Sequence, residues 1–276
     1  MSASIVVVSD LHVGSKLALC PPGPINLKDG AKYTPTRTQG QLWEWWQDFA
    51  DGIPKDKPWW LVVNGDAVDG VHIRSELIIR PSVAFQSALA VRCLDELIGR
   101  GPGHPERIFF TRGTGWHVGT ESDQEEPIAA ELGAEKDPLT GGSTFWHLIF
   151  DKDGTRFDFK HHPRTKGMMP HTKGPGINRL AFIIQYARLE AGLPVPDLAI
   201  RSHVHFHQDS GSVNYKVQAI TTPAWKIGFD GYVNKIGFEQ DSHIGGLYVN
   251  VEEGQPHTVT AKRYSFGKEA QSVWTP

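Results

Sequence analysis

Short apolar runs, each followed directly by polar residues, recur along the chain from its start to about residue 200. They lie at 5–8, 59–63, 107–111, 156–160 and 198–201. Apolar runs of this length between polar clusters are typical of buried β-strands. The pattern therefore predicts five strands, each of which leads into a polar loop.

Apolar residues at spacings of three and four predict helices between these strands. The first helix contains Leu42 and Phe49 and ends at Gly52, and the second runs from near Pro81 to Gly99. The third covers about 176–191 and stops before Gly192. The residues of the third helix that are expected to face inward are Leu180, Ile183, Ile184 and Ala187. The tryptophans at 43, 45 and 46 are interpreted as core packing rather than as a stacking platform.

After residue 210 the pattern changes to strands and turns, with strands expected at 215–220, 247–251 and 258–264. An α/β chain with a strand-rich C-terminal third (about 210–276) fits two packed β-sheets flanked by helices better than one doubly wound sheet. Neither a repeat nor a linker divides the sequence, so a single domain over 1–276 is expected.

The composition narrows the class of protein. Hydrophobic residues make up 39%, charged residues 21%, and the formal net charge is −3. This balance argues against a protein that mainly coats nucleic acid or an anionic membrane. Two cysteines, Cys20 and Cys93, are too few for a disulfide framework, and the N-terminus lacks a secretory signal. We therefore expect a cytoplasmic protein with no membrane partner.

The chemistry is concentrated where the predicted strands end. The clusters are Asp10 with His12, Asp66 with Asp69, a glycine-lined loop that contains His117, the pair His161 and His162, and the series His203, His205 and His207. In extended segments residues two apart point to the same side, which would direct Asp10 and His12 to one ion and place the last three histidines on one strand face. Sites in α/β proteins collect at the carboxyl ends of strands, so we expect all five clusters at one end of a sheet.

Carboxylate and imidazole ligands without thiolate suit Mn, Fe, Zn, Co or Ni, rather than Ca alone or an iron–sulfur cluster. A carboxylate can also bridge two ions. Two ions roughly 3.5 to 4 Å apart clamp a phosphoryl group and generate a hydroxide near neutral pH. The clusters therefore favour hydrolysis of a phosphate ester.

These clusters, in this order and strand context, resemble the motif blocks of the calcineurin-like metallophosphoesterases. The resemblance implies a four-layer αββα sandwich in which the strand-rich C-terminal part forms the second sheet. It also implies two divalent metal ions, with Mn the first expectation. The roles that it implies are Asp10, His12 and His205 on the first ion, Asp66 as the bridge, His161 and His203 on the second ion, His117 as general acid and Asp69 as support for the ligands.

Two blocks depart from the family pattern or leave a choice open. The family usually has Gly-Asn-His-Asp or Gly-Asn-His-Glu, with the Asn oxygen on the second ion, whereas this chain has no Asn between Gly113 and Val118. Thr114 is the expected replacement rather than Trp116, or water takes the place. Glu121 or Asp123 would be the acidic partner of His117. In the last block His205 and His207 could replace His203 and His205, but Ser202 favours the latter pair.

The resemblance implies a metal-dependent phosphoesterase. A metal-bound hydroxide would attack a phosphodiester or a phosphomonoester, and His117 would protonate the leaving group. The loop after His162 is expected to contact phosphate through Arg164, Lys166, His171 and Lys173, although a solvated loop fits equally well. A second candidate wall of the substrate site, whose aromatic rings could face a base or an aryl group, consists of Trp225, Lys226, Phe229 and Tyr232. Ordinary packing explains these residues equally well. The expected partner is a phosphate ester, which includes small molecules, nucleotides and nucleic acid. The alternatives are a DNA or RNA nuclease of the same fold and a catalytically degenerate scaffold for protein interaction.

Overall fold

The computed structural model describes residues 2–28, 30–71, 77–115, 123–163, 173–228 and 242–266. Its first sheet has five strands in the order β12-β11-β1-β4-β5. The strands are β1 (Ser2–Val8), β4 (Trp59–Asn64), β5 (Arg107–Thr111), β11 (Ile244–Glu252) and β12 (Thr258–Tyr264). β1, β4 and β5 are parallel, whereas β11 runs antiparallel to both β1 and β12.

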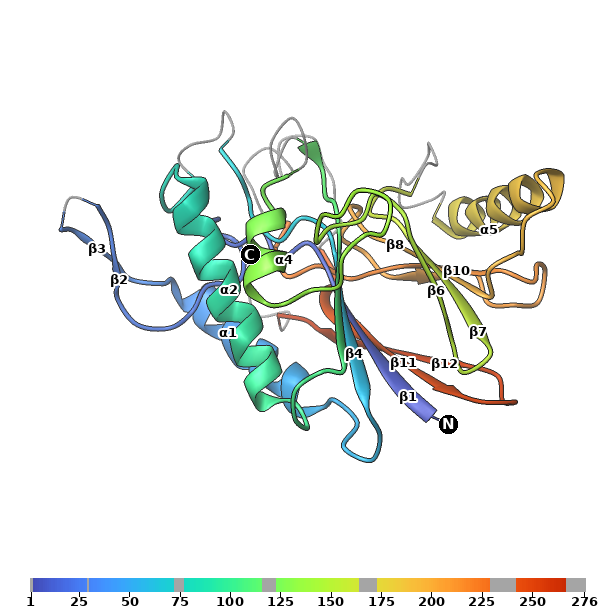
Figure 1. Ribbon diagram of the computed structural model, residues 1–276. Helices are drawn as coiled ribbons and strands as arrows, with labels where there is room; N and C mark the ends of the chain where they lie inside the picture. Colours follow the sequence, from blue (N-terminus) through green and yellow to red (C-terminus); the bar gives the residue numbers. More distant parts are fainter. Residues whose placement is uncertain are drawn as a thin grey trace, which may run out of the picture.

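The second sheet also has five strands, in the order β6-β7-β8-β10-β9. They are β6 (Leu148–Lys152), β7 (Thr155–Phe159), β8 (Leu198–Arg201), β9 (Gln208–Asp209) and β10 (Gln218–Thr221). β7, β8 and β10 are parallel, and β6 and β9 are antiparallel edge strands. A separate hairpin of β2 (Ile25–Asn26) and β3 (Lys32–Tyr33) extends beside the helices (Figure 1).

The two sheets pack face to face, and the alternation of side chains along β1 shows how. Ile5 and Val7 join a buried cluster with Phe157 and Ile200 of the second sheet. Val6 and Val8 point to the opposite face and pack in a second cluster with the helices. Successive side chains of a strand point to opposite faces, so a strand that is apolar throughout must be covered on both sides.

Helices cover the two outer faces. α1 (Arg37–Asp51), α2 (Val83–Arg100) and the short α4 (Glu126–Glu131) lie on the first sheet, and α5 (Lys173–Glu190) lies on the second (Figure 1). α1 begins with a capping box formed by Thr36 and Gln39. The layers are helix, sheet, sheet and helix, which confirms the predicted αββα fold class. Within the described residues, no helix is long and apolar enough to cross a membrane.

The helices differ from the prediction in two respects, namely where α2 ends and which residues of α5 face inward. α2 continues through Gly99 to Arg100, and Gly101 is its C-cap. The buried face of α5 consists of Ile177, Leu180 and Ala181, which pack on Ala219 of β10. Ile183 and Ala187, which were predicted to face inward, are exposed. The helix packs near the edge of the second sheet. Fewer of its apolar residues are therefore covered by the sheet than the sequence pattern suggested.

The C-terminal third does not form the second sheet as the resemblance implied. Only β10 belongs to that sheet, whereas β11 and β12 return to the first. β11 lies between β12 and β1, and all but two of its nine residues are buried. A strand buried on both faces suits an interior position of a sandwich rather than an exposed edge.

Candidate metal centre

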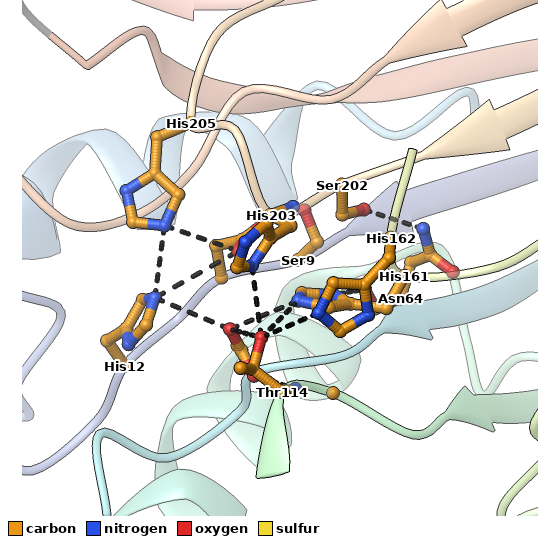
Figure 2. A network of polar contacts seen from close by, with 12 residues as sticks. Ser9, His12, Asn64, Thr114, His161, His162, Ser202, His203 and His205 are labelled. Atoms are coloured by element: carbon orange, nitrogen blue, oxygen red, sulfur yellow. Dashed lines mark hydrogen bonds and ion pairs between the residues drawn. The ribbon is translucent and has the colours of Figure 1, made fainter. Parts of the chain in front are cut away.

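The predicted clusters meet where the carboxyl ends of strands from both sheets come together. β1, β4 and β5 of the first sheet supply Asp10, Asp66 and Thr114, whereas β7 and β8 of the second supply His161 and His203. Figure 2 shows Thr114, His161 and His203 pointing toward one another from the two sheets. The prediction that all five clusters lie at the end of one sheet was therefore wrong, because the strands divide between two sheets.

The loops that carry the site have left-handed backbone conformations. Positive φ angles occur at Asp10 (51°), His12 (45°), Asp66 (54°), His203 (72°) and His205 (58°). Such values are uncommon for residues other than glycine and cluster at functional sites. Asp10 and His12 do converge, but through tight turns rather than through the extended alternation that the sequence suggested. The same holds for the last block, where the histidines do not share a strand face.

Hydrogen bonds between main-chain groups hold the first two loops side by side. The Asp10 N–H donates to the Gly65 carbonyl at 2.9 Å, and the His12 N–H donates to the Asp66 carbonyl at 3.0 Å. Gly65 has φ +85°, and a Cβ atom there would lie 2.4 Å from Nδ1 of His161. Only glycine therefore fits at this position, since the imidazole ring lies directly against the turn.

The first group of candidate ligands is Asp10, His12 and His205. Nε2 of His12 lies 3.1 Å from Nε2 of His205. Asp10 Oδ1 lies 3.3 Å from the same His205 nitrogen and 3.9 Å from that of His12. The Oδ1 atom is buried and makes no hydrogen bond within the described part of the chain. A buried carboxylate oxygen without a hydrogen bond is costly unless a cation binds it.

A hydrogen-bonded series behind His12 fixes the orientation of its ring. Nδ1 of His12 lies 3.1 Å from Asp69 Oδ1, and the Lys226 ammonium donates to the same oxygen at 2.7 Å. Burial alone would raise the pKa of Asp69, but His12 and Lys226 outweigh it and hold that pKa well below its usual range. With its Nδ1–H donated to a carboxylate, His12 presents the lone pair of Nε2 to the site.

The second group of candidate ligands surrounds the hydroxyl of Thr114. Oγ1 of Thr114 lies 3.2 Å from His161 Nε2 and 3.0 Å from His203 Nδ1. It also lies 3.3 Å from His162 Nε2 and donates to Asp66 Oδ2 at 3.1 Å. The structure thus places Thr114, the residue predicted in place of the Asn, among the candidate ligands. The sequence analysis included His162 in a cluster but gave it no role, because a histidine beside a predicted ligand carries no separate signal.

Asp66 connects the two groups. Its Oδ2 lies 3.1 Å from Nε2 of His161 and 3.9 Å from Nε2 of His12. The Thr114 N–H donates to the other oxygen at 2.6 Å, which fixes the carboxylate between the groups. Asp66 Oδ2 thus faces both groups, and its role as a bridge stays a prediction.

The charges of the site shift the pKa values of its histidines in opposite directions. Burial alone would lower the pKa of His161, but the charge and hydrogen bond of Asp66 raise it to about 10. Burial and the neighbouring His161 lower the pKa of His203 to about 4, and the same causes lower the pKa of His162. For Asp10, burial opposes ionisation, yet His205 outweighs it and lowers the pKa to about 2.

A buried chain of hydroxyl and amide groups underlies the site and joins the sheets. Thr111 donates to Asn64 Oδ1 at 2.7 Å, and Asn64 Nδ2 donates to Ser202 Oγ at 2.6 Å. The chain continues through Thr222 to Ser9. All five residues are fully buried and lie at or just after strand ends. A fully satisfied network of this kind fixes the relative position of the loops above it.

Glu125 is another buried group that the sequence analysis missed. Its carboxylate accepts from the Ala67 N–H at 3.0 Å and from the Gly113 N–H at 2.6 Å, which ties the loop after β4 to the loop after β5. Burial and the charge of Asp66 raise the pKa of Glu125 to about 7, although the two N–H donors oppose the shift. The run of acidic residues around it in the sequence gives no sign of which one is buried.

The donor set fits divalent metal ions. His161 donates Nδ1–H to the Asn64 carbonyl at 2.8 Å, so Nε2, which faces Asp66, is the nitrogen left for a proton or a metal ion. Two acceptors that face each other, like the paired Nε2 atoms of His12 and His205, are stable only with a proton or a cation between them. Asp10, His12, Asp66, Thr114, His161, His203 and His205 are therefore all brought together, and their role as metal ligands stays a prediction.

Other predicted residues lie elsewhere or outside the described residues. Nδ1 of His207 lies 3.0 Å from the Thr221 carbonyl, and the candidate ligand groups of the described residues contain His203 and His205 rather than His207, which favours that pair. Trp225 is fully buried against Trp46 and Phe49 and is packing. Asp123 is exposed. The residues outside the described ranges are Trp116, His117, Glu121, Arg164, Lys166, His171, Phe229, Tyr232 and the side chain of Lys173.

No protein-family model matches the chain, and no curated protein matches it. Among solved structures it is similar to wild-type Vps29 of Entamoeba histolytica complexed with Zn²⁺, at 10% identity over 95% of this chain and 98% of that chain, with a TM-score of 0.44. Vacuolar Protein Sorting 29 of Cryptosporidium parvum is 9% identical over 96% and 99% of the two chains, with a TM-score of 0.41. A predicted phosphoesterase of Streptococcus pneumoniae is 11% identical over 95% and 99%, with a TM-score of 0.35.

Proposed function

We propose that this protein is a metal-dependent phosphoesterase that uses two divalent cations to hydrolyse phosphodiester or phosphomonoester bonds. The observation that carries the proposal is the position of Asp66, whose Oδ2 faces His12 of one candidate ligand group and His161 of the other. A carboxylate that faces two such groups can bridge two ions, and two close ions can clamp a phosphoryl group.

The residues divide into two ligand sets on the proposal. Asp10, His12, Asp66 and His205 would hold the first ion, and Asp66, His161 and His203 with Thr114 would hold the second. The first set contains two carboxylates and suits Mn or Fe, whereas imidazole donors also suit Zn, Co or Ni. When bound, the two ions supply charge neutralisation for the phosphoryl oxygens and activation of a water molecule.

The protein itself determines orientation and access. Asp69 and Lys226 hold His12 with Nε2 toward the site, and the Asn64 carbonyl does the same for His161. His162 and His203 are exposed, whereas Asp10 and Asp66 are fully buried. A phosphate ester can therefore reach the site from the side of His162 and His203. Protonation of the leaving group by His117 belongs to the same proposal.

The test measures hydrolysis with and without metal. Protein purified without chelator is assayed with Mn²⁺ on bis(p-nitrophenyl) phosphate, p-nitrophenyl phosphate, cyclic and linear dinucleotides, and single-stranded DNA. We expect hydrolysis of small diesters that disappears after EDTA treatment and returns with Mn²⁺. Preference for single-stranded DNA would instead identify a nuclease, and bound ions without any hydrolysis would identify a scaffold.

A further inference from the structure

We propose that His162 completes the ligand set of the second ion and makes that site prefer a zinc-class ion over Mn²⁺. The inference rests on the proposed function, since it concerns the same metal centre. Three imidazoles would then face the second ion, from His161, His162 and His203, in addition to the carboxylate of Asp66.

The geometry places His162 as close to the centre of this group as the expected ligands are. Its Nε2 lies 3.3 Å from Thr114 Oγ1, compared with 3.2 Å for His161 Nε2 and 3.0 Å for His203 Nδ1. Ligand atoms of the three histidines all lie within 4.8 Å of one another. Figure 2 shows the three rings turned toward Thr114.

Proton counting shows that the hydroxyl of Thr114 cannot satisfy these neighbours. A hydroxyl donates one hydrogen bond and accepts at most two. Four ligand atoms approach Oγ1 within 3.3 Å, and one of them is a carboxylate oxygen that only accepts. Nε2 of His161 also lies 3.1 Å from Asp66 Oδ2, so a proton on it is shared between that carboxylate and Oγ1. A cation at the focus of these atoms satisfies all of them at once.

The kinds of donor in the two groups predict different metal preferences. With His162 the second group has three imidazoles and one carboxylate, which matches the four-coordinate ligand sets of zinc. The first group has the carboxylates of Asp10 and Asp66 with two imidazoles, and oxygen donors suit Mn²⁺ better. The sequence has no Asn between Gly113 and Val118, where the neutral hydroxyl of Thr114 faces the group, and the second imidazole of the His161–His162 pair supplies a further donor there.

His162 can be replaced without disturbing the buried part of the site. His162 is exposed, whereas His161 is buried and hydrogen-bonded to the Asn64 carbonyl. The test compares wild-type protein with His162→Ala and His162→Asn. The control is His104→Ala, which removes another exposed histidine, whose Nδ1 is hydrogen-bonded to the Pro105 carbonyl. Circular dichroism and thermal unfolding establish that each variant is folded.

Isothermal titration of chelator-treated protein with Zn²⁺ and with Mn²⁺ measures each binding step, and elemental analysis gives the metal content. We expect two Zn²⁺ binding steps in wild type and in the control. In the titration with Mn²⁺, we expect the second site to bind more weakly than the first and to fill later. His162→Ala should weaken one Zn²⁺ step at least about tenfold and leave the other unchanged. His162→Asn, which restores an oxygen donor, should narrow the preference for Zn²⁺ over Mn²⁺.

Loss of neither step in His162→Ala, or equal loss of both, would overturn the role of His162 while leaving the proposed function standing. Equal affinity of the second site for Mn²⁺ and Zn²⁺ in wild type would overturn the metal preference. Wild-type protein that binds no divalent ion would instead refute the proposed function, together with this inference.

Discussion

The two halves of the metal centre differ in burial, in donor type and in support. In the inner half Asp10 and His12 are buried and only His205 is partly exposed, and the ion pair of Asp69 with Lys226 supports this half from behind. The half around His161 and His203 is rich in imidazole and opens outward through exposed histidines. On the proposed function, the first half would fix an ion in place, whereas the second half would meet the substrate.

The halves also differ in how they hold protons when no metal competes. In the inner half, His205 stabilises the charged form of Asp10 and lowers the pKa of that carboxyl to about 2. In the outer half, His161 takes a proton with its pKa raised to about 10, whereas the pKa of His203 falls to about 4. Because ligands must be deprotonated to bind metal, His161 is where protons and metal compete most directly.

The largest effect is expected from Asp66→Asn, which removes the carboxylate that the two halves share. We expect loss of tight binding of both ions and a fall in kcat of about a thousandfold or more, equivalent to about 4 kcal/mol of transition-state stabilisation. Elemental analysis and initial rates on bis(p-nitrophenyl) phosphate measure the two losses.

Asp69→Asn is the matched control, since Asp69 contacts only the inner half among the candidate ligands described above. Its metal loss should be confined to one ion. Full activity of Asp66→Asn with both ions retained would contradict the bridging role of Asp66 and the proposed function with it.

A second effect follows from the proton on His161 in metal-free protein. Below pH 6.5 this histidine is protonated in both the folded and the unfolded chain, so its pairing with Asp66 contributes fully to stability. Between pH 6.5 and about 10 the unfolded chain loses the proton first, and stability should fall as pH rises. We expect a fall of a few kcal/mol in the free energy of unfolding.

Urea unfolding in EDTA at several pH values between 6 and 9.5 measures this dependence. Saturation with Zn²⁺ should remove it, since the cation replaces the proton between His161 and Asp66. His161→Gln should remove it as well, and an unchanged slope in that variant would assign the dependence to another group.

The smallest effect is expected from Lys226→Met, which acts on the inner half through Asp69. Without the ammonium, the Asp69 carboxylate is less firmly placed against Nδ1 of His12, and metal affinity of the inner site should fall about 10- to 100-fold. Lys226→Arg retains the charge and should recover part of the loss. Titration with Mn²⁺ measures the metal affinity of both variants. An equal loss of affinity at the outer site would show general misfolding instead.

Much of the fold could be predicted because local pattern determines it. The strands β5, β8 and β12 have the predicted bounds, and the ends of strands carry the polar clusters as expected. The pairing of strands is a different matter, because an apolar run has the same appearance in either sheet. β11 could therefore not be assigned to the first sheet from its own residues.

The residues of the site were easier to predict than its geometry. Aspartate and histidine after strands gave the candidate ligands, but nothing in the sequence indicates positive φ at Asp10 or His205. Lys226 is 157 positions from Asp69, and only the return of the chain beside the first loop brings them together. His162 could not be separated from His161, since both follow the same strand.

The left-handed turns have a consequence for any attempt to improve this protein by selection. Each such conformation at a residue with a side chain costs about 1 kcal/mol or more relative to an unstrained backbone. Of the five positions 10, 12, 66, 203 and 205, glycine would relieve that cost with the least loss of buried contacts at the exposed His203 and the partly exposed His205, so screening for heat resistance alone would reward loss of these two candidate ligands. Engineering for robustness should therefore retain these five positions and search the helices and outer strands.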